Sequence, residues 1–69
     1  MDMEEVKIDA GYIFEDVVSY IDEGVLDINN IGVYEIANCG LEQTDDVEYD
    51  EAVIDEVFDM LTKKYGVKF

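Results

Sequence analysis

Residues 42–59 read EQTDDVEYDEAVIDEVFD, and this stretch carries the highest charge density and the clearest periodicity of the chain. Half of its residues are Asp or Glu, and none is basic. Apolar side chains recur with helical spacing from its second half onward, at Val53, Ile54, Val57, Phe58, Leu61 and Tyr65. The spacing predicts an amphipathic helix that Gly66 ends, with Lys63 and Lys64 in the last turn, where positive charge is favoured. Thr44 and Asp50 are both candidate N-caps for it, and the sequence does not decide between them.

A second helical stripe lies nearer the N-terminus. Within residues 10–23 the apolar positions are Ile13, Phe14, Val17, Val18, Tyr20 and Ile21. Asp9 is the expected N-cap, and Gly24 is expected to end this helix in the left-handed conformation. Residues 1–8 alternate weakly, which favours a short edge strand or an extended arm.

The segment between the two predicted helices is rich in β-branched and aromatic residues. Asn29-Asn30 tolerates positive φ, so it predicts a two-residue hairpin turn between strands at 25–28 and 31–37. A third short strand is expected at 41–44, and the tail at 67–69 adds an edge strand or packs on the core. The predicted fold class is therefore α+β, with two amphipathic helices packed on one face of a small antiparallel sheet. Residues 1–69 are expected to form a single small acidic domain.

The charge balance restricts the partners. The chain has 19 Asp and Glu against 4 Lys, a formal net charge of −15, and no basic residue between Ile8 and Thr62. Repulsion disfavours direct binding to nucleic acid and to anionic membranes. No apolar run approaches the length of a membrane span, and the N-terminus is acidic, so neither a span nor a secretion signal is expected. The single Cys39 fits a reducing cytoplasm.

Residues that carry chemistry are scarce. The chain has no His, and no basic neighbour in sequence activates Cys39, which is expected to be structural or inert. Alternating acids from Asp46 resemble the start of an EF-hand calcium loop. However, Glu51 stands where that loop needs Gly, and Val57 where it needs a bidentate Glu. We therefore expect no enzyme activity, no cofactor and no dedicated metal site.

In size, in charge and in its lack of catalytic motifs, the chain resembles the small acidic DNA-mimic proteins of lytic bacteriophages, including those that inhibit the nucleoid protein HU. The resemblance implies a protein that occupies the DNA-binding surface of a basic host protein, HU first, and displaces DNA in the bacterial cytoplasm. The residues that best match a row of phosphates are Asp45, Asp46, Glu48, Asp50, Glu51, Asp55, Glu56 and Asp59. The sequence does not decide between a monomer and a homodimer.

Two alternatives share these features. Inhibitors of restriction or CRISPR nucleases are also DNA mimics. An acidic adaptor of RNA polymerase or of another host enzyme would instead bind through an apolar patch. The candidate aromatic anchors for either mode are Tyr12, Tyr34, Tyr49 and Tyr65. Salt dependence and competition by duplex DNA separate a mimic from an adaptor.

Overall fold

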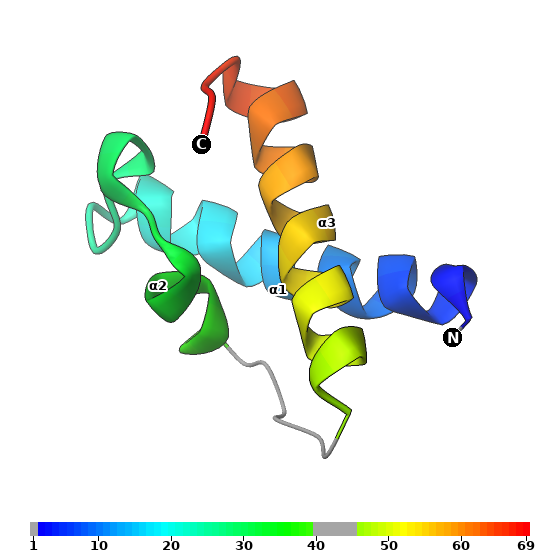
Figure 1. Cartoon of the computed structure of the whole chain (residues 1–69). Coiled ribbons are helices and arrows are strands. Elements are labelled where there is room, and N and C mark those ends of the chain that lie inside the picture. The colour runs from blue at the N-terminus through cyan, green and yellow to red at the C-terminus, as the bar shows by residue number, and fades with distance from the viewer. Residues whose placement is uncertain (1, 40–45) are drawn as a thin grey trace.

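The computed structural model describes residues 2–39 and 46–69, and these residues are mostly helical. In chain order the segments are α1 (Met3–Asp22), the 3-10 turn η1 (Ile28–Asn30), α2 (Val33–Ala37) and α3 (Val47–Tyr65). The long helix α3 crosses α1, and the short α2 packs beside α3 (Figure 1). The described residues contain no strand, so the predicted α+β class with an antiparallel sheet is wrong.

The contact between α1 and α3 forms most of the core. Each helix contributes one buried stripe, which consists of Val6, Ala10, Ile13 and Val17 on α1 and of Val53, Ile54, Val57 and Leu61 on α3. The stripe predicted for α3 is therefore confirmed. Burial of each Val, Ile or Leu side chain contributes about 1.5–3 kcal/mol, and this contact is the main source of stability.

Helix α1 begins seven residues earlier than its predicted start at Ala10. Asp2 is the N-cap, and its Oδ1 accepts a hydrogen bond from the Glu4 N–H at 3.0 Å. Val6 lies one turn before Ala10 and continues the buried stripe, so packing extends the helix toward the N-terminus. The predictions of an N-terminal strand or arm and of an Asp9 cap are wrong.

The two predicted helix ends are confirmed. Gly24 follows α1 with φ +80°, and its N–H donates to the Ile21 carbonyl at 3.1 Å. The Val25 N–H donates to the Tyr20 carbonyl at 2.9 Å, which completes a Schellman motif. Gly66 ends α3 with φ +71°.

The N-cap of α3 is neither of the two predicted residues. Asp46 caps the helix, and its Oδ1 accepts from the Tyr49 N–H at 3.1 Å. Asp50 lies within the first turns of α3, and Thr44 lies outside the described residues. Asp46 satisfies an N–H group that the helix itself leaves without a partner.

The predicted hairpin at Asn29-Asn30 is replaced by helical turns. The Asp27 Oδ1 accepts from the Asn29 N–H at 2.9 Å and starts η1. The α2 segment then buries Ile36 and exposes the consecutive residues Val33 and Tyr34. Neighbouring strand residues point to opposite faces, so this exposure suits a helix. The β propensity of Val, Tyr and Ile is a weak preference that packing overrides here. The strand predicted at 41–44 lies outside the described residues.

The C-terminal tail forms no strand, so its predicted edge-strand placement is wrong, and Phe69 packs on the partly buried Phe58 while remaining more than half exposed. The Phe69 ring lies 4.8 Å from the Phe58 ring, centroid to centroid. No helix in the described ranges is both long and apolar enough to cross a lipid bilayer.

Leu61→Ala tests the helix-crossing core. Leu61 is fully buried, and such a truncation costs about 2–5 kcal/mol through lost transfer energy and a residual cavity. A domain of this size has about that much total stability, so we expect a mostly unfolded variant at 37 °C. Circular dichroism melts check this, with Val47→Ala at a largely exposed position of the same helix as the control. A cooperative Leu61→Ala melt near that of the parent chain would contradict the assigned core.

Candidate functional site

The solvent side of α3 carries a row of carboxylates. At 3.6 residues per turn, four exposed acids lie opposite the buried stripe of this helix. We call Glu48, Glu51, Asp55 and Asp59 the α3 acidic row. From first to last residue the row spans about 17 Å of helix axis at about 1.5 Å per residue. One strand of DNA carries about five phosphates over that distance, so the four carboxylates approach its charge density.

Three of the other four predicted site residues do not extend this row. Glu56 is half-buried on a flank of α3. Asp46 caps the helix, and Asp50 is half-buried in the first turns. The fourth, Asp45, lies outside the described residues. The helix geometry therefore divides the predicted set, and four of its seven described members converge on one surface.

One end of the α3 acidic row is partly compensated. Lys63 Nζ lies 3.0 Å from the Asp59 Oδ2, one helical turn away, and this hydrogen-bonded pair raises the pKa of Lys63. Both side chains are more than half exposed, so the pair adds little stability. No Lys or Arg occurs in the sequence between Ile8 and Thr62, so Glu48, Glu51 and Asp55 have no basic neighbour along α3. The negative potential is therefore strongest toward the N-terminal part of the row.

Helix α1 carries a second row that the sequence reasoning did not single out. We call its members Glu4, Glu15 and Asp22 the α1 acidic row, because all three are exposed and lie opposite the stripe of α1. The buried stripes of the two helices face each other, so the two rows point to opposite sides of the molecule. A single flat partner surface can therefore meet only one row at a time.

A third acidic group lies where the N-terminal part of α1 meets the start of α3. The Tyr49 hydroxyl of α3 donates a hydrogen bond to Asp9 Oδ2 of α1. This bond, burial of the hydroxyl and the negative charges of Asp9, Glu5 and Asp2 raise the pKa of Tyr49 to about 12. The spacing of Asp2, Glu5 and Asp9 would have revealed this shared flank, had α1 been predicted to start at Met3.

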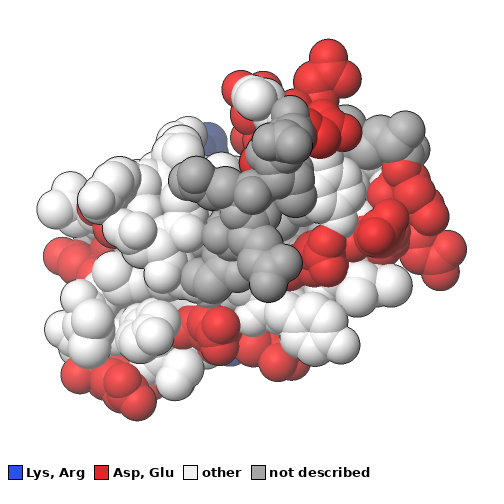
Figure 2. Space-filling model, turned by 90° about the horizontal axis from the view of Figure 1, so that it is seen from below, with Lys and Arg blue, Asp and Glu red and all other residues white. Residues whose placement is uncertain are grey.

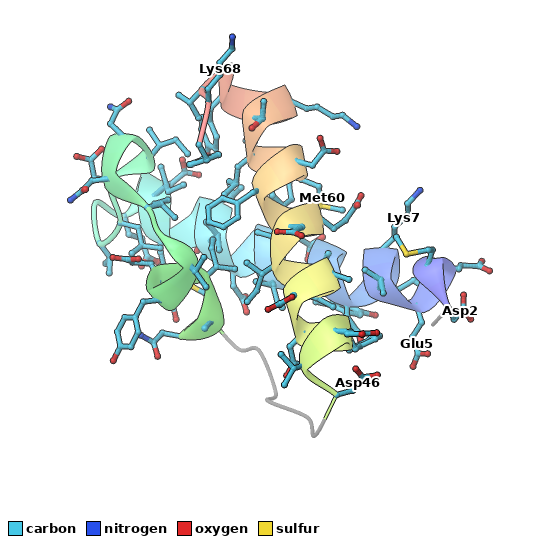
Figure 3. The ribbon with its side chains drawn as sticks, viewed as in Figure 1. Asp2, Glu5, Lys7, Asp46, Met60 and Lys68 are labelled. Carbon is cyan, nitrogen blue, oxygen red and sulfur yellow. The ribbon has the colours of Figure 1, made fainter. Side chains whose placement is uncertain are left out.

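Two of the four Lys side chains lie apart from the acidic residues at the start of α1 and α3. Figure 3 shows Lys7 and Lys68 extending to the side of the molecule opposite Glu5 and Asp46. The view from below in Figure 2 shows acidic side chains on every side of that face, with basic side chains visible only at small points behind it. The face seen in Figure 2 is therefore strongly negative at its rim.

Cys39 does not join any of these groups. It is buried, and burial and the negative charge of Asp16 raise the pKa of its thiol. The thiol is therefore protonated at neutral pH and a poor nucleophile, in agreement with the prediction of a structural cysteine. Within residues 2–39 and 46–69, no three Cys, Asp or Glu side chains gather in an arrangement that could hold a metal ion.

Tyr49→Phe tests the contact between α1 and α3. The hydroxyl gives up its proton near pH 10 in the unfolded chain and near pH 12 in the folded one. The folded state binds more protons between these values, so this contribution to stability is complete below pH 10 and lost as the pH rises to 12. We expect the parent chain to have a higher free energy of unfolding than Tyr49→Phe below pH 10, and this difference to disappear as the pH rises to 12. Urea melts at each pH measure the difference, and Tyr12→Phe at an exposed site is the control. A constant difference through pH 12 would contradict the assignment.

Salt dependence tests whether the acidic rows repel one another. Charges farther apart than about 8 Å are screened at physiological ionic strength and weakly screened in dilute buffer. We expect the melting temperature to rise from low salt to ~0.5 M sodium chloride. Replacing the α1 acidic row by Gln and Asn should reduce that rise. A melting temperature that falls with salt would show that Lys pairs or helix N–H groups compensate the acids locally.

No protein-family model, no curated protein and no solved structure matches the chain.

Proposed function

We propose that the protein is a DNA mimic that binds the DNA-binding surface of a basic bacterial protein, most directly the nucleoid protein HU, and displaces DNA from it in the cytoplasm. The observation that carries the proposal is the α3 acidic row. Its carboxylates are exposed, lie on one side of a rigid helix and approach the charge spacing of a DNA strand. Lys and Arg side chains that bind phosphates can bind such carboxylates with the same charge-assisted hydrogen bonds.

A groove beside the row supports the proposal. It has a volume of about 730 Å³, and Asp55 of the row lies on its wall together with the apolar Val33, Phe58 and Phe69 and with the basic Lys68. Carboxylates provide steering and register, while apolar contacts supply affinity that salt does not screen. A partner bound to the row can therefore gain both kinds of contact.

The overall charge supports binding by competition. With a formal net charge of −15, the protein repels DNA and attracts cationic surfaces. When this inhibitor is bound, its carboxylates cover the Lys and Arg side chains of the partner's DNA-binding surface. Restriction or CRISPR nucleases offer comparable cationic surfaces and are the next targets to test.

A competition gel shift tests the proposal directly. Purified HU is bound to a labelled DNA duplex, and the protein is added at increasing concentration. We expect the duplex to be released, and the concentration needed for release to increase with added duplex. Direct binding of the protein to HU without DNA should weaken as salt is added. A ternary complex in which neither ligand weakens the other would refute DNA mimicry and favour an adaptor that binds elsewhere.

Charge reversal locates the binding surface. Glu48→Lys, Glu51→Lys and Asp55→Lys together should weaken binding to HU by well over tenfold, because close charge pairs in favourable interfaces contribute about 1.5–7 kcal/mol each. The matched control is Glu4→Lys, Glu15→Lys and Asp22→Lys, which makes the same charge change on the opposite side of the molecule. Isothermal titration calorimetry measures both, and circular dichroism verifies the fold. Equal losses in the two triple variants would mean that total charge matters and the α3 acidic row does not.

A further inference from the structure

A second groove lies between the end of α1 and α2, and it shares Glu35 with the groove beside the α3 acidic row. Its volume is about 320 Å³, and its walls include Tyr20, Val25, Leu26, Tyr34, Glu35 and Cys39. Two of these side chains remain largely in water, with exposed fractions of 65% for Val25 and 76% for Tyr34, and Tyr20 is 40% exposed. Apolar and aromatic side chains that line one groove are available to a ligand.

Local hydrogen bonds hold both walls of this groove in place. On one side, the N–H groups of Val25 and Leu26 donate to the Tyr20 carbonyl at 2.9 and 3.2 Å. On the other side, Glu35 Oε2 accepts from the Gly32 N–H at 2.9 Å. That bond fixes the carboxylate at the edge of the groove and leaves Oε1 as an acceptor for a ligand. Little ordering is therefore required when a ligand binds.

The net negative charge of the protein determines which class of ligand the apolar groove can bind. A second copy of the chain would bring another fifteen net negative charges against this face. A nucleic acid would be repelled for the same reason. A cationic segment is attracted by Glu35 in the groove and by Asp16, whose charge reaches Cys39 in its wall.

We propose that this groove binds an arginine side chain with a neighbouring aliphatic residue, presented by an extended segment of the basic partner. The inference rests on the proposed function for the origin of the segment. The guanidinium stacks on the Tyr34 ring and pairs with Glu35, while the aliphatic side chain packs on Val25 and Leu26. Arginine suits this site better than lysine, because its planar guanidinium both stacks on an aromatic ring and binds a carboxylate through two N–H groups.

The probe is an acetylated and amidated tetrapeptide of sequence Gly-Leu-Arg-Val, with Gly-Leu-Lys-Val as its matched analogue. The peptides are titrated into the uniformly ¹⁵N-labelled full chain and followed by NMR. We expect saturable shift changes centred on Tyr20, Val25 and Tyr34, with the arginine peptide bound roughly two- to fivefold more tightly than the lysine peptide. Changes spread along α3, or equal affinity for the two peptides, would overturn the proposal.

Paired variants separate a specific groove from general attraction of cations. Tyr34→Ser should weaken the arginine peptide by roughly fivefold, whereas Tyr12→Ser, at another exposed tyrosine, should leave its affinity unchanged. Glu35→Gln should remove most of the preference for arginine over lysine. Equal behaviour of the two serine variants would refute the assignment. Sedimentation that shows a dimer lost in Tyr34→Ser would assign the groove to a second copy and overturn the proposal.

The groove and the α3 acidic row can fail independently. The charge-reversed Glu48, Glu51 and Asp55 variant should lose displacement of DNA from HU and still bind the arginine peptide. If the parent chain binds the peptide specifically but never competes with DNA, the proposed function fails and the groove stands. If it competes with DNA but does not discriminate between the peptides, the groove proposal fails alone.

Discussion

The packing of α1 against α3 is the contact on which the rest of the structure depends. It supplies eight of the buried core residues, and it fixes which sides of the two helices remain in solvent. The acidic rows exist as rows only because each helix turns its apolar stripe toward the other. Ile36 of the short α2, with Ile31 and Cys39 on either side of that helix, then completes a core that two crossed helices cannot enclose alone. In so small a domain the packing of α1 against α3 therefore determines both the stability of the fold and the positions of the acidic rows.

The sequence predicted the long amphipathic elements well and the short segments poorly. The stripe of α3 and the glycines that end both helices followed from spacing and from backbone freedom at Gly24 and Gly66. The prediction of a hairpin over residues 25–37 was wrong because β-branched and aromatic residues were given more weight than the spacing of the residues that packing buries. The start of α1 was missed because the weak alternation of residues 1–8 was interpreted as a strand or an arm, and only packing against α3 shows that Val6 belongs to the stripe.

The same reasoning applies to the candidate site. Counting acids along residues 42–59 gave the correct helix but overstated the charge that one partner can meet. Helix geometry distributes those acids among an exposed row, a flank and a cap. The sequence could identify which residues were acidic, but not which were occupied with capping α3 or half-buried against the core. The Tyr49–Asp9 bond joins residues forty positions apart, and no local pattern predicts such a contact.

The opposite orientation of the two acidic rows gives the protein two negative sides. A basic molecule seated on α3 leaves Glu4, Glu15 and Asp22 facing outward. The outer surface of such an assembly still carries carboxylates, so an approaching polyanion meets like charge even after the inner side is neutralised. In the proposed complex, occupation of one side would convert part of a cationic surface into an anionic one, and the side that makes no contact would oppose recapture of DNA there.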